Sequence, residues 1–153
     1  MLLKDGGPRA EKGYQSKLKI YLATRLYFIF IYFIMLAKRL RLVKEKDFKK
    51  IFKLGKVFYS EIFCIKILAN GLDVNRYGIV ISTKVSKKAV ERNKLKRWFR
   101  AAIKEFDKKL AIGFDLVIIA SPTALSREYK FIKSELDKVW LKLKLFKSNK
   151  PHA

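Results

Sequence analysis

Cysteine and histidine are almost absent from this chain, which has one of each among its 153 residues, Cys64 and His152. A single cysteine cannot form an intramolecular disulfide, which is typical of proteins from a reducing compartment such as the cytoplasm. The two residues also cannot build a zinc finger or another Cys/His metal site. His152 lies in a C-terminal Lys-Pro-His-Ala segment that we expect to be frayed, so neither a His-based triad nor a Cys–His dyad is expected. Any catalysis should therefore depend on other groups.

Acidic residues are scarce as well, with 13 Asp and Glu against 36 Lys and Arg, which gives a formal net charge of +23. The chain is 50% hydrophobic and 14% aromatic, so it is not a disordered basic tail. Its length suits one domain. Such a surplus of charge favours a polyanionic partner, with nucleic acid ahead of an anionic membrane or an acidic protein. A merely solvated lysine-rich surface is the alternative.

A long hydrophobic run is also missing. Leu26–Ala37 contains twelve consecutive apolar residues, five of them aromatic, whereas a bilayer span needs about 20. The run could be a short signal anchor, with the following Lys38, Arg39 and Arg41 on the cytoplasmic side. It could instead be a core helix or strand. A third interpretation, which we favour, is that Met35 is the true start and residues 1–34 come from an over-extended reading frame.

The charge divides unevenly along the chain. Residues 1–34 contain six of the basic and two of the acidic residues, so residues 35–153 hold +19 of the +23. We therefore expect an atypical N-terminal extension at 1–34, misassigned or disordered, a folded domain at 35–147 and a basic tail at 148–153. An intact-mass measurement of the native protein that includes residues 1–34 would contradict an internal start.

Hydrophobic periodicity predicts the elements of the first half of this domain. A helix is expected over Lys44–Leu54, with Gly55 as its stop. A strand is expected over Phe58–Ala69, where alternate residues share one side. Asn70–Asp73 has turn chemistry, and a second strand is expected over Tyr77–Ser82.

The second half begins with the clearest helix, Lys88–Leu110, in which one apolar stripe faces the core. A buried strand is expected over Phe114–Ala120 and a final helix over Arg127–Leu145. The order αββαβα implies an α+β sandwich, with helices packed on a small mixed sheet.

The start of the long helix concentrates positive charge. Eight basic residues and one acid, Glu91, occupy the seventeen positions from Lys84 to Arg100. On the helix, the basic side chains lie opposite the apolar stripe, whereas solvated helices normally mix Glu with Lys. A rigid basic stripe beside the free N–H groups of a helix start suits phosphate binding, and arginine adds forked donors. The pattern favours an RNA- or DNA-binding helix.

One segment of this helix is more specific. Ala89-Val-Glu-Arg92-Asn93-Lys-Leu-Lys96-Arg97-Trp-Phe-Arg100 resembles the signature of the bacterial ribonuclease P protein component. The resemblance extends from Met35 to about Leu145. It includes the basic segment from Met35 to Leu42, the pair Asp47-Phe48, Gly55, the segment Arg76-Tyr-Gly78-Ile and the segment Gly113-Phe-Asp115-Leu-Val-Ile. It also supports the internal start, because members of this family typically begin near the position of Met35.

The resemblance implies an αβββαβα sandwich with a small mixed sheet and a left-handed βαβ crossover, an exception to the usual handedness. Its third strand would lie at Thr83–Val85. The implied function is that of the protein subunit of ribonuclease P, an endoribonuclease that removes the 5′ leader of precursor tRNA. In this family the RNA subunit and its Mg²⁺ ions carry out hydrolysis. No protein-bound cofactor and no stable membrane association are expected, and the implied location is the cytoplasm.

The resemblance also implies two sets of site residues and no catalytic residue. The RNA subunit would contact Lys84, Lys87, Lys88, Arg92, Asn93, Lys94, Arg97 and Lys104. The single-stranded leader would lie in a cleft between the first helix and the sheet, on Phe48, Phe52, Phe63, Lys96 and Arg100. Aromatic faces and cations together are typical of single-strand grooves. For the three phenylalanines, plain core packing is the alternative.

Three positions depart from the family pattern, and two other functions stay open. Ala101, Ser121 and Thr83 stand where the family usually has Glu, Arg and Lys. The alternative to a ribonuclease P subunit is a ribosomal or other structural RNA-binding protein. A nuclease that uses carboxylates and a metal is less favoured, because the aspartates form no close cluster in the sequence.

Overall fold

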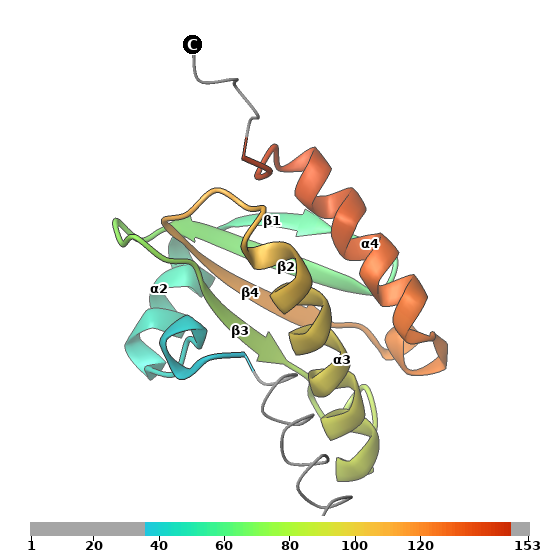
Figure 1. Cartoon of the computed structure of the whole chain (residues 1–153). Coiled ribbons are helices and arrows are strands. Elements are labelled where there is room, and N and C mark those ends of the chain that lie inside the picture. The colour runs from blue at the N-terminus through green and yellow to red at the C-terminus, as the bar shows by residue number, and fades with distance from the viewer. Residues whose placement is uncertain (1–35, 148–153) are drawn as a thin grey trace, which may run out of the picture. The chain divides into compact units, whose positions relative to one another are not determined.

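The computed structural model describes residues 36–147, which form a four-stranded sheet with one helix on one face and two on the other (Figure 1). None of the helices in this range is long and apolar enough to cross a bilayer. Most of the apolar run from Leu26 and the tail at 148–153 lie outside the described residues. In chain order the elements are η1 (Lys38–Leu40), α2 (Glu45–Leu54), β1 (Lys56–Tyr59), β2 (Phe63–Ala69), β3 (Arg76–Val80), α3 (Ala89–Asp107), β4 (Phe114–Ala120), η2 (Pro122–Ser126) and α4 (Tyr129–Lys142).

The sheet is mixed, with the strand order β1-β2-β4-β3. β2 pairs antiparallel with β1 and with β4, while β3 pairs parallel with β4 at the edge. The chain passes from β3 through α3 to the parallel neighbour β4, and with α3 toward the viewer this crossover is left-handed (Figure 1). The α+β class, the αβββαβα order and the unusual handedness are thus confirmed.

Alternation along the strands divides the core between the two faces of the sheet. Residues such as Phe63, Ile65 and Ile118 face α3 and α4 and belong to the larger core. Val117, on the other face, packs with Ile51 of α2 and with Leu42 in a smaller core. Most of the buried apolar residues belong to the larger core. On the other face, α2 is the only α-helix among the described residues, and it covers only part of the sheet (Figure 1).

The predicted strand Phe58–Ala69 is in fact two strands, because the chain turns at Ser60–Ile62. A buried carboxylate fixes this turn: Ser60 Oγ donates to Glu135 Oε2 of α4 at 2.5 Å. Lys138 Nζ also donates to Glu135, at 2.6 Å. These hydrogen bonds hold the pKa of the Glu135 carboxyl below its usual value, first through Lys138 and then through Ser60. No local turn signal in the sequence marks this tertiary contact.

The expectation of a strand at Thr83–Val85 is wrong, since these residues form a turn before α3. The split of the long strand supplies the missing strand instead. The helix ends also shift: α3 stops at Asp107, and Leu110 forms an isolated bridge with Phe146. The last helix, expected over Arg127–Leu145, spans Tyr129–Lys142 and follows the separate 3-10 helix η2, which starts at Pro122.

Candidate nucleic-acid interface

The helix α3 presents a basic outer face above an apolar inner one. Leu95, Phe99 and Ile103 are buried in the larger core. Asn93, Lys94 and Arg97 are exposed, whereas Lys96, Arg100 and Lys104 are partly buried at the sides of the helix. The periodicity of the sequence therefore placed these side chains on the correct side of α3. A rigid row of cations at this spacing can contact successive phosphates of a folded nucleic acid.

The basic loop before α3 is fixed by three side chains. Ser86 Oγ accepts from the Lys88 backbone N–H at 3.0 Å and donates to Glu91 Oε2 at 2.5 Å. The Arg92 guanidinium reaches forward beyond the helix start, where Nη1 donates to the carbonyls of Ser86 and Lys87 at 2.8 Å each. Arg92 thus has a structural role that spacing did not predict. The exposed Lys84, Lys87 and Lys88 are presented by an ordered loop.

Arg41, next to β3, lies close enough to Arg100 of α3 for their charges to interact. Arg41 pairs with Tyr77 of β3 in an isolated parallel bridge, and its Nε donates to the Leu36 carbonyl at 2.7 Å. Partial burial, and then the positive charge of Arg41, lower the pKa of the Arg100 guanidinium. Two like charges held in partly desolvated positions favour an anion between or beside them. Arg41 lay in a segment noted for its family resemblance but was not predicted as a site residue.

The opposite face of the sheet holds a second group of candidates on α2. Phe48 is partly buried and packs against the sheet, whereas Phe52 is 42% exposed. Lys66 of β2 lies with Nζ 5.0 Å from the Phe52 ring centroid and donates to the Phe52 carbonyl at 2.9 Å. The lysine therefore binds the last turn of α2 and places a cation on an exposed aromatic ring. Lys66 was not among the residues predicted for the site, because its spacing in the sequence does not reveal that it lies beside Phe52.

The structure corrects the grouping of Phe63 with these residues. Phe63 is 1% exposed and lies on the α3 and α4 side of the sheet, in edge-to-face contact with Phe99 at 5.7 Å. Phe48 and Phe52 belong to α2, which covers the opposite face of the sheet. Phe63 therefore cannot contact a ligand bound beside Phe48 and Phe52. For Phe63, the geometry supports the alternative of plain core packing over leader binding.

A salt-bridge cluster fixes α2 on this face. Arg76 of β3 donates two hydrogen bonds to Asp115 of β4, at 2.8 and 2.6 Å, and one to Asp47 of α2 at 3.1 Å. Hydrogen bonding to Asp115, more than any other contact, raises the pKa of Arg76. Asn70 Nδ2 also donates to Asp115. Asp47, Arg76 and Asp115 all lie in segments that resemble the family. Arg76 binds Asp115 in a bidentate pair and also binds Asp47, so it links α2 to β3 and β4.

Gly78 allows α2 to approach the sheet. A Cβ at this position would lie 2.8 Å from two ring atoms of Phe48, which is closer than van der Waals contact allows. The absence of a side chain on β3 therefore seats the Phe48 ring against the sheet. This explains, in physical terms, why a glycine stands in the middle of a strand.

The described residues do not offer a metal site. Among residues 36–147, no group of three or more His, Cys, Asp or Glu side chains converges. Asp47 and Asp115 come together, but the Arg76 guanidinium lies between them and takes the place that a cation would occupy. This pair of carboxylates is therefore already neutralised by Arg76.

A basic helix with an ordered basic loop on one face of the sheet, and an exposed aromatic ring with a lysine on the other, are typical of a nucleic-acid-binding α+β protein. The family described as Ribonuclease P matches residues 36–144. The ribonuclease P protein component of Synechocystis sp. is 38% identical over 106 residues, which cover 69% of this chain and 86% of the relative. That of Thermotoga maritima is 42% identical over 93 residues, 61% of this chain and 78% of the relative.

Solved structures agree with this assignment. A Staphylococcus aureus RNase P protein, a mutant with defective mRNA degradation activity, superposes with a TM-score of 0.67 at 31% identity, covering 71% of this chain and 92% of that one. The RNase P protein of Thermotoga maritima gives 0.60 at 34% identity, covering 65% and 93%. The chain belongs to the bacterial ribonuclease P protein family and is a protein subunit of ribonuclease P. The comparisons give no support to the ribosomal alternative.

Proposed function

We propose that this protein binds the catalytic RNA of ribonuclease P and the 5′ leader of precursor tRNA, and so assists removal of the leader. The observation that carries the proposal is that two exposed surfaces of different chemistry lie on opposite faces of one small sheet. The α3 face is cationic and suits a phosphate-rich, folded RNA. The α2 face combines an exposed aromatic ring with a lysine, which suits unpaired bases.

We assign the RNA-subunit contacts to α3 and its preceding loop. The ordered loop supplies Lys84, Lys87 and Lys88, and the exposed side of α3 supplies Asn93, Lys94 and Arg97. Lys104 continues the row. Arg92 contributes by shaping the loop through its hydrogen bonds to two carbonyls, as well as by its charge.

We assign the leader to the α2 side of the sheet. Phe52 offers an exposed ring for base stacking, and the Phe48 ring lies against Gly78 one turn earlier in the same helix. Lys96 and Arg100 lie one turn apart on the same side of α3. Arg41, which is bridged to Tyr77 of β3, adds a further cation close to Arg100. Phe63 is not part of this proposal, because it is buried on the other face of the sheet.

We assign phosphodiester hydrolysis and Mg²⁺ binding to the RNA subunit. In support, the aspartates that converge in the described part of the chain are neutralised by Arg76. The role left to the protein is electrostatic: its cations reduce repulsion between the two RNA molecules, which lowers the Mg²⁺ concentration that the complex needs. The single free cysteine fits a reducing cytoplasm.

Reconstitution tests the proposal directly. The full chain is combined with its cognate RNA subunit and a precursor tRNA, and 5′ cleavage is followed while Mg²⁺ is lowered. We expect the protein to stimulate cleavage most strongly at low Mg²⁺. A protein that binds the RNA subunit without stimulating cleavage would contradict the proposal, and cleavage by the protein alone would return the hydrolysis to a protein nuclease.

A further inference from the structure

Trp98 lines a hollow beside α3 and is not among the residues assigned above to RNA-subunit binding. The hollow has a volume of about 120 Å³ and is lined by Glu91, Lys94, Leu95, Trp98 and Leu125. It therefore lies between the first half of α3 and the 3-10 helix η2. Trp98 is only partly buried there, with its ring 6.5 Å from that of Tyr129 on α4. Tryptophan so placed offers a rigid aromatic face to a ligand.

We propose that this hollow accepts one unstacked nucleobase of the RNA subunit, which stacks on Trp98. The inference rests on the proposed function, because it extends the RNA contact of α3 around the side of the helix. Folded RNAs are recognised largely through bases that leave the stack and lie on aromatic side chains. Lys87, Lys88 and Lys94 stand around the same helix start and can hold the flanking phosphates.

The chemistry of the lining favours a base over a phosphate. Two leucines supply apolar walls, and Leu125 is 39% exposed at the rim. The Glu91 carboxylate would repel a phosphate inside the hollow, but it can accept a hydrogen bond from the amino or imino group of a base. The anionic backbone would then stay outside, near the lysines.

Lys94 marks the face that a base would use. Its Nζ lies 4.6 Å from the Trp98 ring centroid and so covers the ring in the free protein. An exposed cation–π contact is weaker than the stacking of a base on an aromatic side chain. We therefore expect the base to displace the flexible lysine, whose ammonium can turn to a phosphate while its charge stays at the interface.

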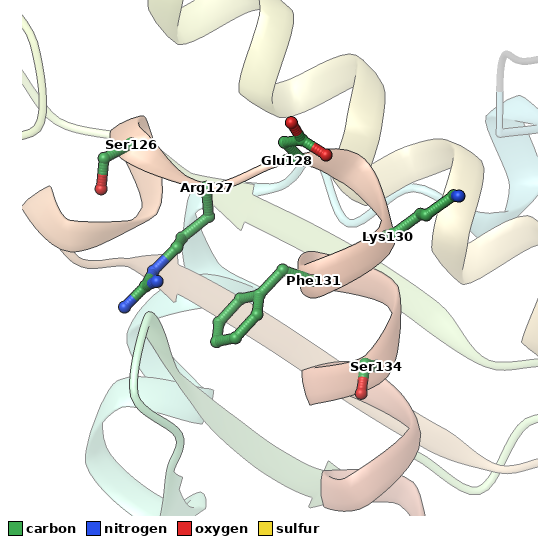
Figure 2. A pocket seen from close by; sticks show the side chains of 6 residues that line it. All are labelled: Ser126, Arg127, Glu128, Lys130, Phe131 and Ser134. Atoms are coloured by element: carbon green, nitrogen blue, oxygen red, sulfur yellow. The ribbon is translucent and has the colours of Figure 1, made fainter.

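A larger hollow nearby lacks these properties. It has a volume of about 480 Å³ and is lined by Ser126, Arg127, Glu128, Lys130, Phe131 and Ser134. Figure 2 shows Arg127 and Phe131 on one side of α4, whereas Lys130 points away from them. The Arg127 guanidinium covers the Phe131 ring and forms an ion pair with Glu61. The one aromatic ring in this hollow is thus already covered by a guanidinium that an ion pair holds in place, so the hollow beside α3 is the better site for a base.

Tryptophan fluorescence tests the proposal without altering the site. The chain has two tryptophans, and Trp140 is fully buried. The full chain is titrated with transcribed RNA subunit, and the same titration of Trp98→Leu gives the Trp140 background. We expect RNA to quench Trp98 emission and to protect it from acrylamide. Trp98 emission and acrylamide access that stay unchanged in the bound complex would overturn the proposal.

Affinity supplies a second readout. We expect Trp98→Leu to weaken binding of the RNA subunit about tenfold and Trp98→Phe to restore much of the loss, while circular dichroism shows both variants folded. Leu141→Ala, which truncates an exposed apolar side chain of α4, is the control. Wild-type affinity in Trp98→Leu would contradict the inference but leave the proposed function intact. Failure of the unaltered protein to stimulate cleavage would instead contradict the proposed function.

Discussion

Phe52 and Phe63 are the same residue type with opposite surroundings. Phe52 is 42% exposed at the end of α2, whereas Phe63 is 1% exposed between the sheet and α3. We predict that Phe52→Ala lowers affinity for leader-bearing precursor by about 1 kcal/mol more than affinity for mature tRNA, because it removes a stacking face. Binding of the reconstituted enzyme to both RNAs measures this difference.

Phe63→Ala provides the contrast. It should cost about 3–5 kcal/mol of unfolding free energy in urea, because it opens a cavity in the larger core. Phe52→Ala should cost far less. Equal losses of affinity for the two RNAs in Phe52→Ala would show that its ring serves packing alone.

Arg92 and Arg97 also separate by their contacts. Arg97 is exposed, whereas the Arg92 guanidinium donates to two carbonyls of the basic loop. We predict that Arg97→Ala lowers the salt slope of RNA-subunit binding by about one unit, as expected for one lost phosphate contact. Arg92→Ala should lower affinity further, because the loop that carries Lys87 and Lys88 loses its support. An unchanged slope in Arg97→Ala would exclude a phosphate contact there.

Among the elements, α2 depends on a glycine of the neighbouring sheet. Gly78→Ala would place a Cβ 2.8 Å from the Phe48 ring, and we expect a loss of about 1–3 kcal/mol of unfolding free energy as the ring is displaced. Urea denaturation measures the loss. In the double variant with Phe48→Leu, the cost of Gly78→Ala should shrink. If Gly78→Ala loses the same unfolding free energy with and without Phe48→Leu, the loss would come from β3 itself and not from the clash with the Phe48 ring.

The turn between β1 and β2 depends on the ionised Glu135. Its folded-state pKa lies below its usual value, so its stabilising contribution is present above the unfolded pKa of about 4.3 and is lost as the pH falls through the folded pKa. We predict that Glu135→Gln is less stable than the unaltered protein in urea at pH 7, and that the gap closes toward pH 3. Asp137→Asn on the same helix is the control, and a gap that persists at pH 3 would contradict the prediction.

For the whole molecule, net charge sets opposite responses to salt. The +19 of residues 35–153 repels itself in the free protein, so added NaCl should raise the melting temperature. The same salt should weaken RNA binding, because counterions released into a more concentrated salt solution gain less entropy. Thermal unfolding and RNA titrations over the same range of salt measure both trends. A melting temperature that falls with NaCl would show that attractive ion pairs dominate the free fold.

Local pattern predicted much of the fold. The stripe of Leu95, Phe99 and Ile103 marked α3, and the run Phe114–Ala120 marked a buried strand with its observed bounds. Period and apolar run length report which side of an element is buried, and these signals need no partner. The break at Ser60–Ile62 was missed because the buried carboxylate that fixes it lies on α4, 75 residues along the chain from Ser60.

The candidate site divides in the same way. The sequence by itself determined the concentration of positive charge before and along α3, the side of the helix that carries it, and the family signature. Only the tertiary structure decided which aromatic rings share a face, because pairing and packing choose between the two sides of a sheet. It moved Phe63 into the core, joined Arg76 to Asp47 and Asp115, and brought η2 against α3 beside Trp98. Charge and period are properties of the chain itself, whereas burial and neighbours exist only once distant elements have packed together.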